Sequence, residues 1–155
     1  MRQDFHATLR LPADAGAVWE VVGDVPTVLS WISIVETIGE SDSGYTVVLA
    51  DRLGPFKLRA DLAVAVEERV EGRLIRAHGD GEDRQIGSRL VVDVALALEQ
   101  QGPETQLDVS GSYEVTGRPA ALGAGSIRKK ATAVLAEFFS AAERSVGAAA
   151  PSGPA

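Results

Sequence analysis

A long amphipathic segment near the end of the chain constrains the fold most. Between Arg118 and Val146, apolar side chains recur at steps of three and four residues, the period of one face of an α-helix. These side chains are Ile127, Ala131, Val134, Leu135, Phe138, Phe139, Ala142 and Val146. An apolar face of this length must be covered, and the preceding segments supply the apolar surface. The pattern therefore predicts a long helix packed across a sheet.

Alternating apolar and polar residues fill most of the chain before that helix. The alternation predicts seven strands, at about 5–11, 33–38, 45–50, 56–68, 73–78, 90–99 and 106–115. Two short helices are expected between the first two strands, one capped by Asp14 and one opened by Pro26. Connections of a few residues between successive strands favour hairpins, so the sheet is predicted to be antiparallel.

Composition excludes several classes of function. The chain has 155 residues, which allows one sizeable core, and its 15 basic against 22 acidic side chains give a net charge of −7. This charge repels polyanions, so we expect no nucleic-acid partner. Cysteine is absent, which excludes disulfides, thiolate catalysis and metal sites built on cysteine.

Neither a membrane span nor an export signal is visible in the sequence. The first six residues carry charge and lack the apolar run of a signal peptide, and the most apolar stretch, Leu90 to Leu98, is interrupted by Asp93. We therefore expect a soluble, cytoplasmic protein with one domain over residues 1–146. The small, Gly- and Pro-containing tail at 147–155 is predicted to be disordered.

Signs of catalysis or metal binding are weak. His6 is expected on the solvent face of the first strand and His78 beside turn residues, with no Ser or Cys nucleophile nearby. The acidic residues Asp80, Glu82 and Asp83 lack the spacing of a calcium-binding loop, so a solvated hairpin turn is the simpler interpretation. We assign no catalytic and no metal-binding residue.

Gly123-Ala-Gly125-Ser126, just before the helix, invites a phosphate-binding interpretation through helix N-terminal amides. The third glycine of a dinucleotide fingerprint is missing, because Arg128 stands in its place, and the preceding strand is expected to be antiparallel. The cations Arg128, Lys129 and Lys130 are therefore predicted to form a solvated or partner-facing patch. Such a patch also suits transient contact with an acidic membrane surface.

Small residues stand at several positions that should face the helix: Ala60, Ala77, Gly79, Gly111 and Ala131. Protein interiors pack densely, so small residues opposite one another indicate either close approach of helix and sheet or a cavity. The residues alone leave both interpretations open.

Short sequences spread over nearly the whole chain suggest a family. They are Phe5 with Leu9, Pro12, Val18-Trp19, Leu53-Gly54-Pro55, Ala77-His78-Gly79-Asp80-Gly81, Thr105, Gly117-Arg-Pro-Ala-Ala-Leu-Gly123 and Phe138-Phe139. With the order of predicted elements, they resemble the carbon monoxide dehydrogenase G-subunit family, which lies in the START and Bet v 1-like (SRPBCC) superfamily. The resemblance implies an α+β helix-grip fold: a seven-stranded curved antiparallel sheet, two short helices and a long C-terminal helix.

The resemblance also implies a binding protein rather than an enzyme. It favours a cavity that holds a lipophilic ligand, an isoprenoid quinone or another lipid, without a covalent bond. The implied partner is a molybdenum hydroxylase of the carbon monoxide dehydrogenase type, supported in electron transfer, membrane recruitment or maturation. The residues predicted to line the cavity, each of which alternatively belongs to an ordinary core, are Trp31, Phe56, Leu58, Leu62, Val92, Leu96, Val109, Tyr113, Ile127, Leu135 and Phe138.

Two alternatives remain at this point. One is an enzyme of the same superfamily, such as a polyketide cyclase or aromatase, which needs polar side chains inside the pocket. The predicted inward positions offer Tyr113 and little else. The other is an assembly factor with a closed core that works through its surface.

Overall fold

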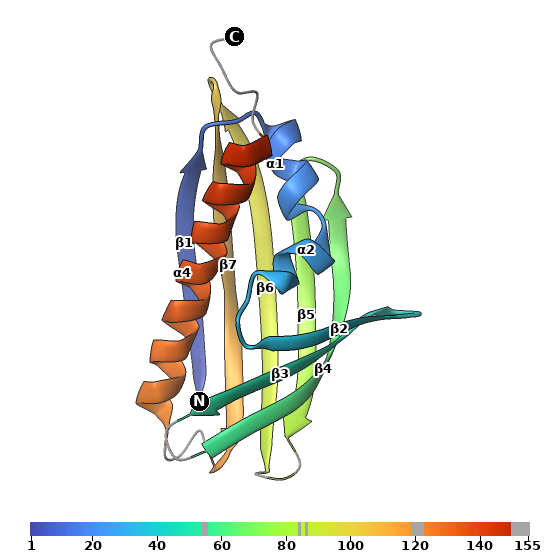
Figure 1. The fold of residues 1–155 in the computed structure, drawn as a ribbon, viewed down its shortest axis with the longest axis vertical. Coiled ribbons are helices and arrows are strands. Elements are labelled where there is room, and N and C mark those ends of the chain that lie inside the picture. The colour runs from blue at the N-terminus through green and yellow to red at the C-terminus, as the bar shows by residue number, and fades with distance from the viewer. Residues whose placement is uncertain (54–55, 84, 86, 119–122, 150–155) are drawn as a thin grey trace.

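The structure, a computed structural model, describes residues 1–53, 56–83, 85, 87–118 and 123–149. One antiparallel sheet contains seven strands in the order β1-β7-β6-β5-β4-β3-β2. The helices α1, α2 and α4 lie on one face of this sheet (Figure 1). In chain order the elements are β1 (Arg2–Leu11), α1 (Ala15–Val22), α2 (Val25–Ser30), β2 (Val35–Ser41), β3 (Gly44–Leu53), β4 (Phe56–Val70), β5 (Leu74–Asp83), β6 (Ser88–Gln101), β7 (Glu104–Gly117) and α4 (Ala124–Ala149).

The predicted fold class is confirmed, and the differences concern the ends of elements. The long helix begins at Ala124 rather than Arg118 and continues to Ala149, three residues past the predicted domain end at 146. Residues 119–122 of the predicted helix lie outside the described residues. So do residues 150–155, for which disorder stays a prediction. The fifth strand continues to Asp83, whereas the pattern predicted an end at His78.

The sheet bends strongly, which gives it a concave face. In Figure 1, β2 and β3 cross the view obliquely while β6 and β7 run nearly along the long axis. The strand register shifts between Val35 and Thr37 in β2, and between Val66 and Glu68 in β4. Such β-bulges bend a strand and increase its twist. The helices lie on the concave side of this bend (Figure 1).

A compact core joins α1, the end of α4 and the adjoining strands. Asp14 caps α1 as predicted, because its carboxylate accepts a hydrogen bond from the Ala17 amide at 2.8 Å. The side chains of this core are almost inaccessible: Leu11, Val18, Val22, Leu107 and Val146. Thr105, also fully buried, donates from Oγ1 to the Ala13 carbonyl oxygen at 2.8 Å. The space between α4 and the sheet is therefore filled by side chains at the end near α1.

The small inward residues do not all leave open space. A Cβ at Gly111 would lie 1.9 Å from the Asp93 carbonyl oxygen and 2.9 Å from Cζ of Phe5, its partner on β1. Gly111 therefore permits a close approach and is covered by an aromatic ring. Ala60 and Ala131, in contrast, face the cavity described next.

Candidate functional site

A cavity of about 520 Å³ lies between α4, α2 and the concave face of the sheet. Its volume falls within the range of small-molecule sites, about 300–1,000 Å³. The lining is mostly aliphatic and aromatic. The apolar lining residues are Phe5, Val28, Ile32, Ile34, Leu49, Leu58, Ala60, Leu90, Val92, Val94, Leu96, Val109, Val115, Ile127, Ala131, Val134, Leu135 and Phe138. Helix and sheet thus enclose a hollow instead of packing flush.

Eight of the eleven residues predicted from the sequence line this cavity. They are Leu58, Val92, Leu96, Val109, Tyr113, Ile127, Leu135 and Phe138. Trp31 does not, because its ring packs against Phe138, with centroids 5.7 Å apart. Leu62 is buried instead in the cluster with Val47 and Leu49. The side chain of Phe56 lies outside the described residues. Contact of the eight with a ligand stays a prediction.

Several lining residues were missed by the sequence interpretation. Phe5 and Leu49 continue the inward alternation of β1 and β3, so the period of two residues could have found them. Val28 and Ile32 come from α2 and the segment after it. No local pattern indicates which way so short a helix docks.

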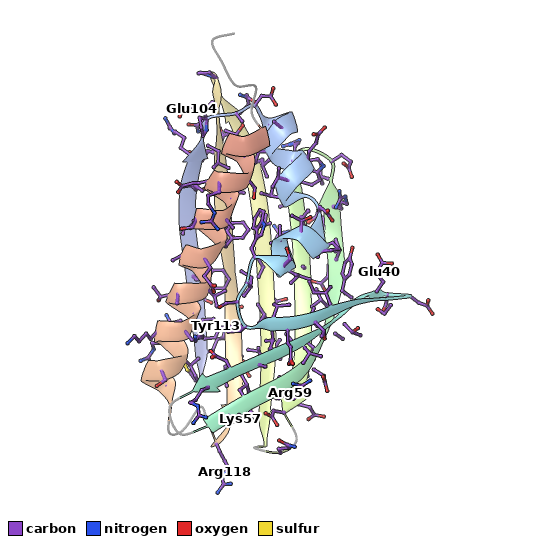
Figure 2. All side chains as sticks on the ribbon, viewed as in Figure 1. Glu40, Lys57, Arg59, Glu104, Tyr113 and Arg118 are labelled. Carbon is purple, nitrogen blue, oxygen red and sulfur yellow. The ribbon has the colours of Figure 1, made fainter. Side chains whose placement is uncertain are left out.

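Six of the polar lining residues collect at one end of the cavity. Gln3 and Asp4 come from the start of β1, Asp51 from the end of β3, and Arg128, Lys130 and Thr132 from the start of α4. Figure 1 shows these three chain segments together near the N-terminus, at the lower end of the molecule. Figure 2 shows Lys57, Arg59 and Arg118 at the same end, with Tyr113 further up beside α4. We call this polar end of the cavity the mouth.

An ion pair connects α4 to β3 at the mouth. Nζ of Lys130 lies 2.8 Å from Oδ2 of Asp51, and the two side chains are 35% and 21% exposed. Burial acts to raise the pKa of Asp51, but Lys130 and the Arg52 amide outweigh it, so the pKa is lowered from its usual 3.8. Oδ2 is buried, and Lys130 is its partner in this ion pair. The predicted cationic patch is thus divided: Lys129 is exposed, whereas Lys130 is committed to Asp51.

Tyr113 contributes a further polar group to the cavity wall. Its side chain is 8% exposed and packs with Ile127 and Phe5, whose ring stacks on it at 6.5 Å. Burial raises the pKa of the hydroxyl above its usual 10.0, with Arg128 opposing the change. The hydroxyl is therefore protonated near neutral pH and is available as a hydrogen-bond donor.

The prediction that Asp80, Glu82 and Asp83 form a solvated hairpin turn is wrong for Asp83. It ends β5, is 3% exposed, and accepts hydrogen bonds from the backbone amides of Arg59 at 2.8 Å and Gln85 at 3.0 Å. Asp80, also on β5, pairs with Arg89 at 2.6 Å. These carboxylates are held by the protein itself, so the cluster is part of the sheet and not a loop.

A separate polar group lies on the convex face. Glu67, His78 and Asp93 come from three neighbouring strands, and each places one potential ligand atom within 4.8 Å of the others. Nδ1 of His78 lies 2.7 Å from Oδ1 of Asp93, and a hydrogen bond between them accounts for the arrangement. His78 therefore lies within a strand with an oriented partner, whereas the sequence placed it beside a turn. His6 is exposed as predicted.

The sequence of residues 8–147 matches the family of the carbon monoxide dehydrogenase G subunit, CoxG. The chain belongs to this family. No curated protein sequence matches it significantly. Within the described part of the chain, no helix has the length and apolar character needed to cross a membrane.

Solved structures with the same fold come from several bacteria. A conserved protein from Geobacillus kaustophilus has a TM-score of 0.80 at 18% identity, over 94% of this chain and 96% of that one. A START superfamily protein from Mycobacterium smegmatis has a TM-score of 0.64 at 17% identity, over 94% and 97%. The Zhui aromatase/cyclase from Streptomyces sp. R1128 has a TM-score of 0.61 at 18% identity, over 96% and 94%. These likenesses confirm the helix-grip fold.

Proposed function

We propose that this chain holds a lipophilic ligand in its cavity and thereby serves a molybdenum hydroxylase of the carbon monoxide dehydrogenase type. The single observation that carries the proposal is an apolar hollow of about 520 Å³ in a member of the CoxG family. An isoprenoid quinone is the candidate ligand, because an oxidase must pass its electrons onward and such quinones combine a long hydrocarbon chain with a small polar head. The chain would support electron transfer from this enzyme, its recruitment to the membrane or its maturation.

Hydrocarbon burial alone provides enough free energy for useful binding. A ligand that buries roughly 400 Å² of apolar surface gains roughly 10 kcal/mol at about 25 cal/mol per Å². Micromolar affinity corresponds to about 8 kcal/mol, and ordering costs reduce the gain toward that value. Val28, Leu96 and Phe138 line the cavity where it meets the core around α1, and this enclosed end suits a hydrocarbon chain.

The residues that line the cavity support a cyclase or aromatase less well than they support a binding protein. Tyr113, Asp51 and Asp83 are polar lining residues, which is the feature such an enzyme requires. The pKa values of Tyr113 and Asp51 do not suit proton transfer near neutral pH. The pKa of Tyr113 is raised and that of Asp51 is lowered, while Asp83 is held by two backbone amides. A binding role fits these groups better.

Solvent extraction tests the identity of the ligand. The full chain is purified from a bacterial host that makes isoprenoid quinones and extracted with organic solvent, and the extract is analysed by mass spectrometry. We expect a quinone in an amount comparable with the protein. Protein that releases no quinone and no other lipid would count against ligand binding, and a different lipid would exclude the quinone alone.

A second measurement tests the proposed partner. A carbon monoxide dehydrogenase reduced by its substrate is mixed with quinone, with and without the purified chain. We expect faster quinone reduction when the chain is present, because it brings the apolar acceptor to the enzyme. An equal rate would contradict a role in electron transfer and leave ligand binding untouched.

A further inference from the structure

The cavity wall contains one tyrosine hydroxyl that the described residues leave without a hydrogen-bond partner. No described residue forms a hydrogen bond with the Tyr113 hydroxyl, although the side chain is 8% exposed and lines the cavity. Across the pair of β1 and β7, Tyr113 lies opposite Gln3, which is one of the mouth residues. A hydroxyl that opens into a cavity and has no partner in the protein can donate its hydrogen bond to a ligand or to water.

The charges at the mouth disfavour an anionic ligand. Of the charged lining residues, Asp4 is exposed and lies 3.8 Å from Arg2, and the buried Asp83 accepts hydrogen bonds from two backbone amides. Lys130 is the less exposed of the two lining cations, and Asp51 at 2.8 Å already compensates its charge. Arg128 is exposed, where solvent screens its charge. A carboxylate head would therefore meet Asp51 without a free cation to balance it.

We infer that the mouth is a head-group site for a neutral carbonyl oxygen at the end of a hydrocarbon chain, with the Tyr113 hydroxyl as the donor. This inference rests on the proposed function and specifies how the ligand lies. The hydrocarbon chain occupies the end beside Phe138, and the carbonyl lies at the Tyr113 hydroxyl. The neutral ion pair lets the site discriminate against free fatty acids, which have the same chain but a charged head.

Matched ligands test the head-group site. Delipidated full-length protein is titrated with undecan-2-one and with undecanoate, each displacing a lipophilic fluorescent dye. We expect the ketone to bind more tightly. Tyr113→Phe should weaken the ketone about fivefold, the value of one neutral hydrogen bond, and leave undecanoate nearly unchanged. Tyr45→Phe is the matched control, since Tyr45 is the other tyrosine and does not line the cavity.

A second variant tests the charge argument. Asp51→Asn removes the counter-charge of Lys130, so the ratio of ketone to undecanoate affinity should shift toward undecanoate by about tenfold. Unfolding midpoints of all variants identify any that fail to fold. If both ligands bind but neither variant changes the ratio, the head-group site is wrong while the proposed function stands. If neither ligand displaces the dye from native protein, both are overturned.

Discussion

Trp31 and Phe138 face each other where α2 meets α4, with ring centroids 5.7 Å apart and planes inclined by 55°. Phe138 also contacts Phe139, with centroids 5.6 Å apart. These aromatic contacts join α2 to α4 beside the enclosed end of the cavity. Trp31 thus supports the wall of the site and does not line it.

Removing the aromatic ring of Phe138 should destabilise the fold strongly. Phe138→Ala is expected to lower the free energy of unfolding by about 3 kcal/mol, because a buried ring is lost next to a space that cannot fully collapse. Phe139→Ala, at a half-buried position, should cost clearly less. Urea unfolding of both variants measures the difference. Equal losses would show that Phe138 has no special position between α2 and the cavity.

Alanine substitutions at Gly111 and Gly125 should change the free energy of unfolding in opposite directions. Gly111→Ala would place a methyl group against the Asp93 carbonyl oxygen, so we expect a loss of several kcal/mol or failure to fold. Gly125→Ala, near the start of α4 with open space around its Cβ position, should stabilise by about 0.5–1 kcal/mol. Thermal and urea unfolding check both, and a tolerated Gly111→Ala would contradict the close contact with β6.

His78 should make stability depend on pH near neutrality. The hydrogen bond with Asp93 raises the pKa of His78 above its usual 6.5, against the opposing effect of burial. A raised pKa in the folded state means that its stabilising contribution is complete below pH 6.5 and is lost as the pH rises through the raised value. The free energy of unfolding should fall across that window.

Asp93→Asn should remove most of this fall, and NMR titration should show the pKa of His78 returning toward its usual value. His78→Gln gives the matching profile for a chain without the titrating ring. If native protein and Asp93→Asn share one pH profile, the hydrogen bond does not govern this dependence.

Much of the fold followed from periodicity. The steps of three and four that contain Ile127, Leu135 and Phe138 predicted which face of α4 is buried, and the structure confirms it. Alternation also assigned Val92 and Val109 to the concave face correctly. Both patterns succeed because a helical stripe or a strand face is set locally, by backbone geometry alone.

The polar mouth needed information that no local pattern contains. Asp51 follows Val47 and Leu49 at steps of two residues in β3, so its position on the concave face was predictable. Its partner Lys130 is distant in the chain, and no local pattern indicates the pairing. The docking of Trp31 on Phe138 likewise depends on where α2 comes to lie. Gly111 was identified as inward, yet only the register with Phe5 shows that a ring covers it.

The most direct test of the cavity beneath α4 is to fill it with a larger side chain. Ala131 lines the cavity, whereas Ala133 on the same helix is exposed, so Ala131→Phe and Ala133→Phe add the same ring inside and outside. Native mass spectrometry with a decyl-substituted benzoquinone counts the bound ligand. We expect one ligand on native protein and on Ala133→Phe, and binding at least about tenfold weaker on Ala131→Phe. Equal uptake by both variants, or none by the native protein, would contradict a ligand site between α4 and the sheet.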